Sequence, residues 1–357
     1  MRSRLSFWKY PISIILLLLV IAAFTLVYTL SETATAPYEP VVSPDPGITE
    51  TPDPNDDPDP FDEPADDPEG DPEDDPENVQ SNVPHYIPPD DDFITLFMDV
   101  SDIHRGYLLL VNQDHVFSIP DDLDLVNINE AQTVNFRVQY TDSRLARSIM
   151  EPLDEMMGDF IAATNMRSVA IISSFRTLGT QESILNNYIR RMGRREALRW
   201  AALPGHSEHH TGLAFDFGIM HGNSRSTFTG TGNTAWFRRN SYEYGFIHRF
   251  QEGKSHITQT AHEPWHFRFV GLPHSTIMVQ HNWCFEEYHD ILREHTYEDP
   301  FEIEIDGITY AIFFALGTEV RIPLDSEFDI SGNNIDGFIV TTVRLEYDHD
   351  EYIDVFV

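Results

Sequence analysis

The sequence is poor in cysteine. Cys284 is the only cysteine among the 357 residues, so no disulfide bond can form within the chain. A domain built from this chain must therefore be stabilised by its hydrophobic core or by a bound metal. The roughly 265 residues from Phe93 onward are enough to form such a core.

Basic residues are also scarce. The chain has 23 Lys and Arg against 59 Asp and Glu, which gives a formal net charge of −36. About 21 of the acidic residues lie between positions 31 and 92, where there is no Lys or Arg, and the remainder from Phe93 onward still carries about −18. A surface of this sign repels phosphate backbones and anionic lipids, so nucleic acid is not expected as a partner.

Residues 11–30 form an almost wholly apolar run. Twenty residues in a helix span about 30 Å, the thickness of the hydrocarbon core of a bilayer. Arg2, Arg4 and Lys9 precede the run, so the positive-inside rule places residues 1–10 in the cytoplasm and the rest of the chain outside. The alternative is a cleavable signal peptide, with Ala34-Thr35-Ala36 as the cleavage site. We favour an uncleaved single-pass anchor in the cell membrane, because the run is longer than a usual signal core.

Residues 31–92 alternate proline with Asp and Glu. Such a composition buries too little apolar surface to offset the entropy of ordering, so this segment is expected to be a disordered linker. Proline stiffness and charge repulsion should extend it into a stalk. Calcium binding by the clustered acids is the alternative, but nothing repeats at the spacing of a calcium loop.

Helical periodicity and short apolar runs alternate irregularly between residues 93 and 298, the range assigned to the first globular domain. Helices are expected over 143–165, where Pro152 would start or kink the helix, and over 180–202. Strands are expected over 169–172, 213–217 and 265–270. Because there is no regular alternation of strand and helix, the pattern indicates an α+β fold with a small sheet and flanking helices.

The mixed helix and strand pattern gives way to strand-like alternation in residues 299–357, which we predict to form a C-terminal β module. Phe301, Ile303 and Ile305 alternate with acids up to Asp306-Gly307, a strong hairpin signal. Further strands are expected over 310–315 and 338–345. We expect this module to pack on the first domain; the alternative is that it binds the cell wall or a partner.

The string His262-Glu263-Pro264-Trp265-His266 matches the helical H-E-x-x-H zinc signature. That signature works because two histidines four residues apart share one face of a helix. Pro264 removes a helical N–H and disfavours the helical conformation at Glu263. We therefore reject the helical reading and expect a strand after Pro264, so that His262 and His266 need not point the same way.

A different set of ligands is available. His209 and Asp216 are seven positions apart, which on an unbroken strand would put them on opposite faces. Thr211-Gly212 can supply a turn that redirects one toward the other. Together with His266 they would form a three-ligand site that leaves a fourth position for water, as catalytic zinc requires. With 16 histidines in the chain, such groupings also arise by chance.

The compound motifs resemble those of VanY-type D-alanyl-D-alanine carboxypeptidases, zinc peptidases with the core shared by lysostaphin and hedgehog-like proteins. The strings are Pro-Gly-x-Ser-Glu-His-x-x-Gly-Leu-Ala-x-Asp from Pro204, Glu-Pro-Trp-His-Phe-Arg-x-Val-Gly from Glu263, and Ser-x-x-Arg followed by Gln from Ser173. The resemblance covers residues 102–271. It implies zinc bound by His209, Asp216 and His266, Glu263 as the catalytic base, and substrate contacts from Arg176, Ser207 and Gln181. Ser174, Phe175 and Phe269 depart from the usual family residues, and none of them is a proposed ligand.

The expected function is therefore that of a zinc-dependent carboxypeptidase. It would remove the C-terminal D-alanine from peptidoglycan stem peptides, acting as a D,D-carboxypeptidase or on a shortened L,D end, with its catalytic domain outside the cell. One alternative is a peptidoglycan endopeptidase, and Arg176 argues against it because an arginine suits a free terminal carboxylate. The other is a non-catalytic, zinc-stabilised muropeptide-binding sensor, in which Glu263 would have no role.

Overall fold

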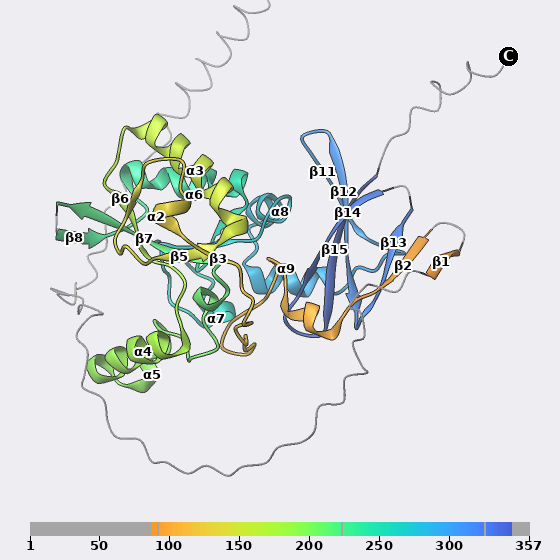
Figure 1. Cartoon of the computed structure of the whole chain (residues 1–357), viewed down its shortest axis with the longest axis horizontal. Helices are drawn as coiled ribbons and strands as arrows, with labels where there is room; N and C mark the ends of the chain where they lie inside the picture. Colours follow the sequence, from red (N-terminus) through yellow and green to blue (C-terminus); the bar gives the residue numbers. More distant parts are fainter. Residues whose placement is uncertain (1–86, 91–92, 223, 325, 345–357) are drawn as a thin grey trace, which may run out of the picture. The chain divides into compact units, whose positions relative to one another are not determined.

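The computed structural model describes residues 87–90, 93–222, 224–324 and 326–344 (Figure 1). The predicted anchor at 11–30 and most of the predicted linker lie outside these ranges. Ile87–Asp90, at the end of the range predicted as linker, form strand β1, because they pair antiparallel with β2 (Phe93–Phe97). Within the described ranges, no helix is long and apolar enough to cross a membrane.

A mixed sheet forms the centre of the first domain. Its strand order is β4 (Arg137–Val138), β6 (Val169–Ser173), β7 (Ala214–His221), β10 (His266–Phe269) and β9 (Phe246–His248), and β8 (Ser224–Thr227) also pairs with β7. Only the β4–β6 pair is parallel. A separate two-stranded sheet joins β3 (Leu125–Asn127) to β5 (Arg144–Ala146). The strands predicted at 169–172, 213–217 and 265–270 are thus confirmed as β6, β7 and β10.

Helix α3 (Met150–Thr164) covers one face of this sheet together with α6 (Ala235–Asn240) (Figure 1). Phe160 of α3 and Phe237 of α6 pack with Phe217 and Phe267 of the sheet in one buried cluster. The helix starts later than predicted, because residues 144–146 are recruited into strand β5 and 147–149 form a short 3₁₀ turn, η2. Pro152 lies in the first turn of α3, where its missing N–H costs no intrahelical hydrogen bond.

The single helix predicted over 180–202 is wrong. The structure has α4 (Leu178–Met192) and a short α5 (Arg194–Ala197), separated by Gly193. Gly193 has φ +80°, a conformation that an L-residue rarely adopts, so the helix ends there.

The remaining helices are α2 (Ile128–Ala131), α7 (Ser255–Thr258), α8 (His274–His281), α9 (Phe285–Leu292) and the 3₁₀ turns η1 (Val100–His104), η3 (Glu208–Thr211), η4 (Gly232–Thr234) and η5 (Ser241–Tyr244).

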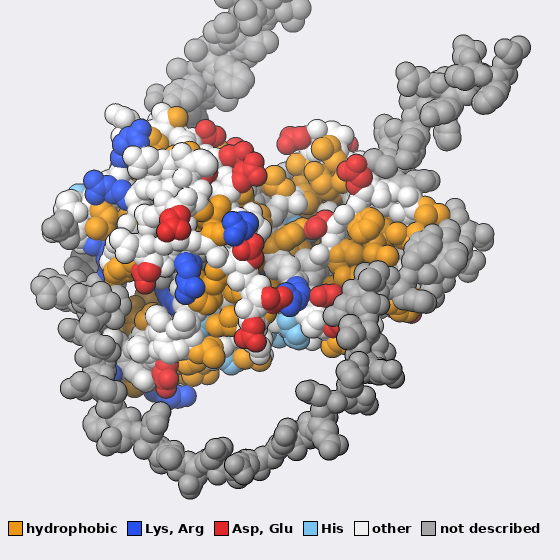
Figure 2. All heavy atoms as spheres, in the orientation of Figure 1, with side chains coloured by type: hydrophobic (Ala, Val, Ile, Leu, Met, Phe, Trp, Pro, Cys, Tyr) orange, Lys and Arg blue, Asp and Glu red, His pale blue; other side chains and the backbone are white. Residues whose placement is uncertain are grey.

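The C-terminal module is a four-stranded antiparallel sheet in the order β11 (Phe301–Ile305), β12 (Ile308–Leu316), β15 (Gly337–Arg344) and β14 (Ser326–Gly332). Asp306 and Gly307 form the predicted two-residue hairpin turn, both with positive φ. A further strand, β13 (Glu319–Pro323), pairs with β2 from the N-terminal side of the first domain. Figure 2 shows hydrophobic side chains gathered over this module, among whose exposed residues are Leu316, Leu324 and Phe328.

The module packs against the first domain, as expected from the sequence. Phe285, Tyr288 and Leu292 of α9 are buried in one cluster with Ile312 of β12 and Ile339 of β15. The same cluster includes Ile247 of β9 and Val270, which directly follows β10. Helix α9 therefore links the module to the strands that carry the candidate site.

Candidate metal centre and active site

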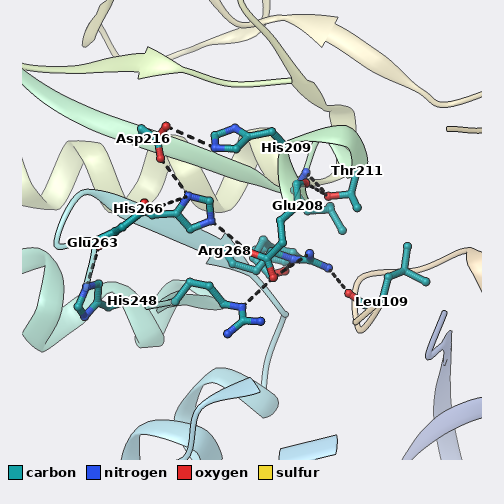
Figure 3. A network of polar contacts seen from close by, with 12 residues as sticks. Leu109, Glu208, His209, Thr211, Asp216, His248, Glu263, His266 and Arg268 are labelled. Atoms are coloured by element: carbon teal, nitrogen blue, oxygen red, sulfur yellow. Dashed lines mark hydrogen bonds and ion pairs between the residues drawn. The ribbon is translucent and has the colours of Figure 1, made fainter. Parts of the chain in front are cut away.

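Alternation along β7 and β10 separates the hydrophobic core from the candidate site. Phe215, Phe217 and Phe267 belong to the buried cluster under α3 and α6. Because successive side chains of a strand point to opposite faces, Asp216 and His266 point away from that cluster. They are directly paired in the antiparallel register of β7 and β10, and Nδ1 of His266 lies 2.9 Å from Oδ1 of Asp216 (Figure 3).

His209 reaches the same place from η3, which precedes β7. Gly212 ends η3 with φ +71°, and the chain turns there into the strand. Nε2 of His209 consequently lies 3.3 Å from Oδ2 of Asp216. The turn predicted at Thr211-Gly212 is confirmed. A Cβ at Gly212 would lie 2.7 Å from Cδ2 of Leu125 and 3.0 Å from the backbone nitrogen of Ala146, so the turn also needs glycine for space.

His209, Asp216 and His266 each offer one ligand atom, and these atoms all lie within 4.8 Å of one another. All three side chains are buried. Nδ1 of His209 is 2.7 Å from the carbonyl oxygen of Ser174, so Nδ1–H donates to it and Nε2 is left to bind a metal. Two imidazoles and a carboxylate are a donor set that suits zinc and leaves a coordination position open. The described residues therefore fit a metal of this kind.

His262 takes no part in this cluster. It is exposed, and its Nδ1 lies 3.0 Å from the carbonyl oxygen of Phe250. The segment before β10 is not helical, and His266 begins the strand. The rejection of the helical H-E-x-x-H reading is confirmed.

Glu263 lies beside the cluster, next to His266 (Figure 3), and its carboxylate makes no hydrogen bond with a described residue. Its Oε2 is 4.0 Å from Nδ1 of His266, and the side chain is buried. Burial raises the pKa of Glu263 to about 8, although the nearby His266 opposes the shift. A carboxylate with a raised pKa and no hydrogen bond is suited to accept and return a proton.

Arg176 contacts the cluster from the loop after β6. Its Nη2 is 2.8 Å from Oδ2 of Asp216 and also donates to Oγ of Ser173 at 2.7 Å. Its Nη1 donates to Oε1 of Gln181 at 3.2 Å, and Nε2 of Gln181 donates to the carbonyl oxygen of Ala202. The structure thus brings Arg176 and Gln181 together at the ligand cluster, with Gln181 orienting the guanidinium.

Ser207 immediately precedes η3 and is buried. Its hydroxyl makes no hydrogen bond with another described residue. A hydroxyl without a partner next to the turn that carries His209 is available to a substrate. The seven residues selected from the sequence thus lie on η3, β7, β10 and the segments immediately around them, or at the start of α4.

Three further charged residues of the site, Glu208, Arg249 and Arg268, are not predicted from the sequence. Oε2 of Glu208 lies 3.1 Å from Nε2 of His266, and Oε1 of Glu208 lies 2.7 Å from Nε of Arg249. Arg268 places Nη1 3.6 Å from the same Oε1. Burial alone would lower the pKa of His266, but the hydrogen bonds to Asp216 and Glu208 raise it to about 9. Glu208 lies within the motif around His209, so its position was visible, but its partners are distant in sequence.

Hydrogen bonds from His210 and from the backbone fix the loop that carries Arg176. His210 is fully buried, its Nδ1 donates to the carbonyl oxygen of Arg176 at 2.7 Å, and its Nε2 accepts from the N–H of Gly205 at 3.1 Å. The N–H of Arg176 in turn donates to the carbonyl oxygen of His209. The arginine loop is therefore tied to the ligand-bearing turn by backbone and side-chain bonds.

A buried two-histidine, one-aspartate cluster with a glutamate carboxylate 4.0 Å from one of its histidines, on an α+β scaffold, fits a metallopeptidase. Residues 142–272 match the family described as VanY, D-alanyl-D-alanine carboxypeptidase. A D-alanyl-D-alanine carboxypeptidase of Enterococcus faecium is 33% identical over 245 residues, which cover 67% of this chain and 76% of that protein. The chain therefore belongs to the VanY family of D-alanyl-D-alanine carboxypeptidases, as the motifs predicted.

Two further relatives extend this comparison. The bifunctional D-Ala-D-Ala dipeptidase and carboxypeptidase VanXYC of Enterococcus gallinarum is 34% identical over 139 residues, which cover 38% of this chain and 73% of that protein. The crystal structure of the vancomycin resistance D,D-dipeptidase VanXYg, in complex with a D-Ala-D-Ala phosphinate analogue, matches with a TM-score of 0.63 and 31% identity. That match covers 71% of this chain and 99% of VanXYg, so it extends well beyond residues 142–272 and confirms the α+β fold.

Proposed function

We propose that the chain is a zinc-dependent D,D-carboxypeptidase that removes the C-terminal D-alanine from peptidoglycan stem peptides. The observation that carries this proposal is the placement of Glu263, a buried carboxylate without a hydrogen bond, beside three converging metal ligands. Arg176, which contacts Asp216 of the cluster, supports a substrate with a free carboxylate. The names of the relatives from Enterococcus support D-Ala-D-Ala as the end that is cut.

His209, Asp216 and His266 would hold the zinc. When bound, zinc supplies a Lewis acid that polarises a carbonyl and makes water a stronger acid. Glu263 takes the proton of the attacking water and passes it to the departing amine, because its carboxylate has no competing partner and its pKa lies near neutrality. The side chains around Glu263 exclude bulk water, which keeps that pKa raised.

Arg176 binds the terminal carboxylate of the substrate. A guanidinium offers a rigid fork of donors that matches a carboxylate, which a lysine does not. Gln181 and Ser173 hold two sides of the fork, so the guanidinium is oriented before substrate arrives. The unpartnered hydroxyl of Ser207 bonds the substrate backbone on the other side of the ligand-bearing turn.

The test is end-product analysis with the full-length, zinc-loaded chain in detergent. Pentapeptide and tetrapeptide wall precursors are incubated separately, and mass spectrometry follows the loss of one alanine, with Glu263→Ala as control. We expect loss from the pentapeptide only. Loss from the tetrapeptide instead would assign an L,D-carboxypeptidase. If neither peptide loses alanine while zinc is bound, the carboxypeptidase proposal fails and an endopeptidase or a sensor remains.

The same proposal includes the location of the enzyme. The apolar run at 11–30 would anchor the chain in the cell membrane, and the acidic, proline-rich residues that follow would carry the catalytic domain outward from it. The test is N-terminal sequencing of the mature protein together with protease accessibility of intact cells. An intact N-terminus and an accessible catalytic domain are expected. A new N-terminus after Ala36 would establish a signal peptide instead.

A further inference from the structure

The imidazole of His266 lies between two carboxylates. Its Nδ1 faces Oδ1 of Asp216 at 2.9 Å, and its Nε2 faces Oε2 of Glu208 at 3.1 Å (Figure 3). Asp216 belongs to the ligand cluster, whereas Glu208 lies on the far side of the ring. Nδ1 is therefore the nitrogen that points at the metal position. An ionised carboxylate only accepts, so Nε2–H donates to Glu208.

Glu208 is held in place by an ion network that is itself buried. Its side chain is 2% exposed, and taking a carboxylate out of water is costly unless cations and hydrogen bonds compensate. Nε of Arg249 lies 2.7 Å from Oε1 of Glu208, and Nη1 of Arg268 lies 3.6 Å from the same oxygen. The two guanidiniums supply the compensating cations on the Oε1 side, and Oε2 is left to accept from His266.

The network continues away from the metal position. The two terminal nitrogens of Arg249 donate to the two carboxylate oxygens of Glu286 on α9, at 2.9 and 2.6 Å. Nδ2 of Asn112 donates to Oε1 of Glu286 at 3.1 Å. Two carboxylates and two guanidiniums thus balance in charge. Only Glu208 of this group touches a metal ligand through a hydrogen bond, whereas Glu286 reaches the same Arg249 without contacting His266.

We propose that Glu208 is a positioning residue for the metal site, which accepts Nε2–H of His266 and so turns Nδ1 toward the metal. The inference rests on the proposed zinc site. Arg249 fixes the Glu208 carboxylate from its other oxygen. Partners of this kind orient a metal-binding histidine and raise its basicity, and their loss costs about 10- to 100-fold in metal affinity.

Glu208 and Glu286 form a matched pair for testing this role. Both are buried carboxylates that pair with Arg249, so Glu208→Gln and Glu286→Gln each remove one negative charge from the same network. If Glu208 had only a structural role, both variants would unfold more easily and both would bind zinc with unchanged affinity. A positioning role weakens zinc binding only in Glu208→Gln.

The experiment measures the zinc dissociation constant of the full-length chain by competition with a chromophoric chelator. Urea unfolding of the metal-free chains is recorded in parallel, and the visible spectrum of the cobalt-substituted chains reports ligand geometry. We expect Glu208→Gln to bind zinc about 10- to 100-fold more weakly with an altered cobalt spectrum. Glu286→Gln should unfold at lower urea yet bind zinc like the wild type, with an unchanged cobalt spectrum.

Glu208→Asp provides a second variant in case Glu208→Gln does not fold. Aspartate keeps the charge near Arg249 but is one methylene shorter, so it draws back from Nε2 of His266. Weaker zinc binding by a folded Glu208→Asp supports the proposal. Wild-type zinc affinity in the folded Glu208 variants, or an equal loss in Glu286→Gln, would overturn it. A wild-type chain that binds no zinc would instead refute the proposed function, so the two failures are distinguishable.

Discussion

Asp216 and His266 stand directly opposite each other on antiparallel strands β7 and β10, with Oδ1 of Asp216 2.9 Å from Nδ1 of His266. The register of two core strands therefore sets the distance between the two proposed metal ligands. The phenylalanines that alternate with them, Phe215 and Phe267, are buried under α3 and α6 and fix that register. The proposed metal position thus lies on the face of β7 and β10 opposite the hydrophobic core.

Glu263→Ala should separate metal binding from turnover. The variant removes the proposed base but no ligand, so it should retain zinc and lose about 10²- to 10⁴-fold in kcat. His209→Ala should lose zinc itself, because Nε2 of His209 faces Asp216 within the ligand cluster. Zinc content by atomic absorption and release of alanine are measured on the same samples. Loss of zinc from Glu263→Ala would show that the glutamate is a ligand.

His262→Ala should be close to neutral. The residue completes the apparent H-E-x-x-H string, but it is exposed and its ring contacts the carbonyl oxygen of Phe250. We expect zinc content and kcat/KM to stay at wild-type values. If His262→Ala strips the metal and His209→Ala leaves it in place, the ligand set is wrong.

Gly212→Ala should damage both fold and site. A residue with a side chain at φ +71° costs about 1–2 kcal/mol in conformation alone. Its Cβ would also meet the backbone of Ala146, which adds a packing cost and displaces the turn that carries His209. Gly222→Ala is the matched control, because Gly222 has φ +63° but open space around the added Cβ. Urea unfolding and zinc affinity are compared, and equal losses in the two variants would contradict a steric role for Gly212.

Local signals in the sequence predicted much of this site. Pro264 excluded a helix, the separation of seven residues between His209 and Asp216 called for a turn between them, and Thr211-Gly212 marked that turn. The positive φ of Gly193, which divides the predicted long helix, was equally local and was missed, because glycine within a helical pattern is often tolerated.

Pairings between distant residues could not be predicted in this way. Strand β2 pairs with β13, which lies more than two hundred residues further along the chain. Arg249 bridges Glu208 and Glu286, and the three residues come from three separate segments of the chain. Nothing near Arg249 in the sequence indicates that it is buried. Such partners are chosen by the tertiary fold, where a buried carboxylate must find a cation.

The stability of the protein should depend on pH through Glu286. Burial alone would raise the pKa of Glu286, but Arg249 lowers it below the usual value near 4.5. A carboxylate whose folded-state pKa is depressed stabilises the fold above its unfolded pKa, and that contribution is lost as the pH falls through the folded pKa. The wild type should therefore exceed Glu286→Gln in free energy of unfolding by roughly 3 kcal/mol at pH 7, the scale for breaking a buried ion pair.

The measurement is urea unfolding of the metal-free wild type and Glu286→Gln at pH 7, 5 and below 4. The difference between the two chains should stay constant from pH 7 to 5 and shrink at lower pH. A difference that is independent of pH over the whole range would show that the charge of Glu286 does not contribute.

Zinc-dependent D,D-carboxypeptidase activity is tested most directly by a zinc titration of the metal-depleted chain, with a pentapeptide ending in D-Ala-D-Ala as substrate. Free D-alanine is measured as zinc is added. We predict that the rate of D-alanine release rises until one zinc is bound per chain, and that Glu263→Ala binds the same single zinc without releasing D-alanine. A folded wild-type chain that binds one zinc and releases no D-alanine would show that it is not a D,D-carboxypeptidase.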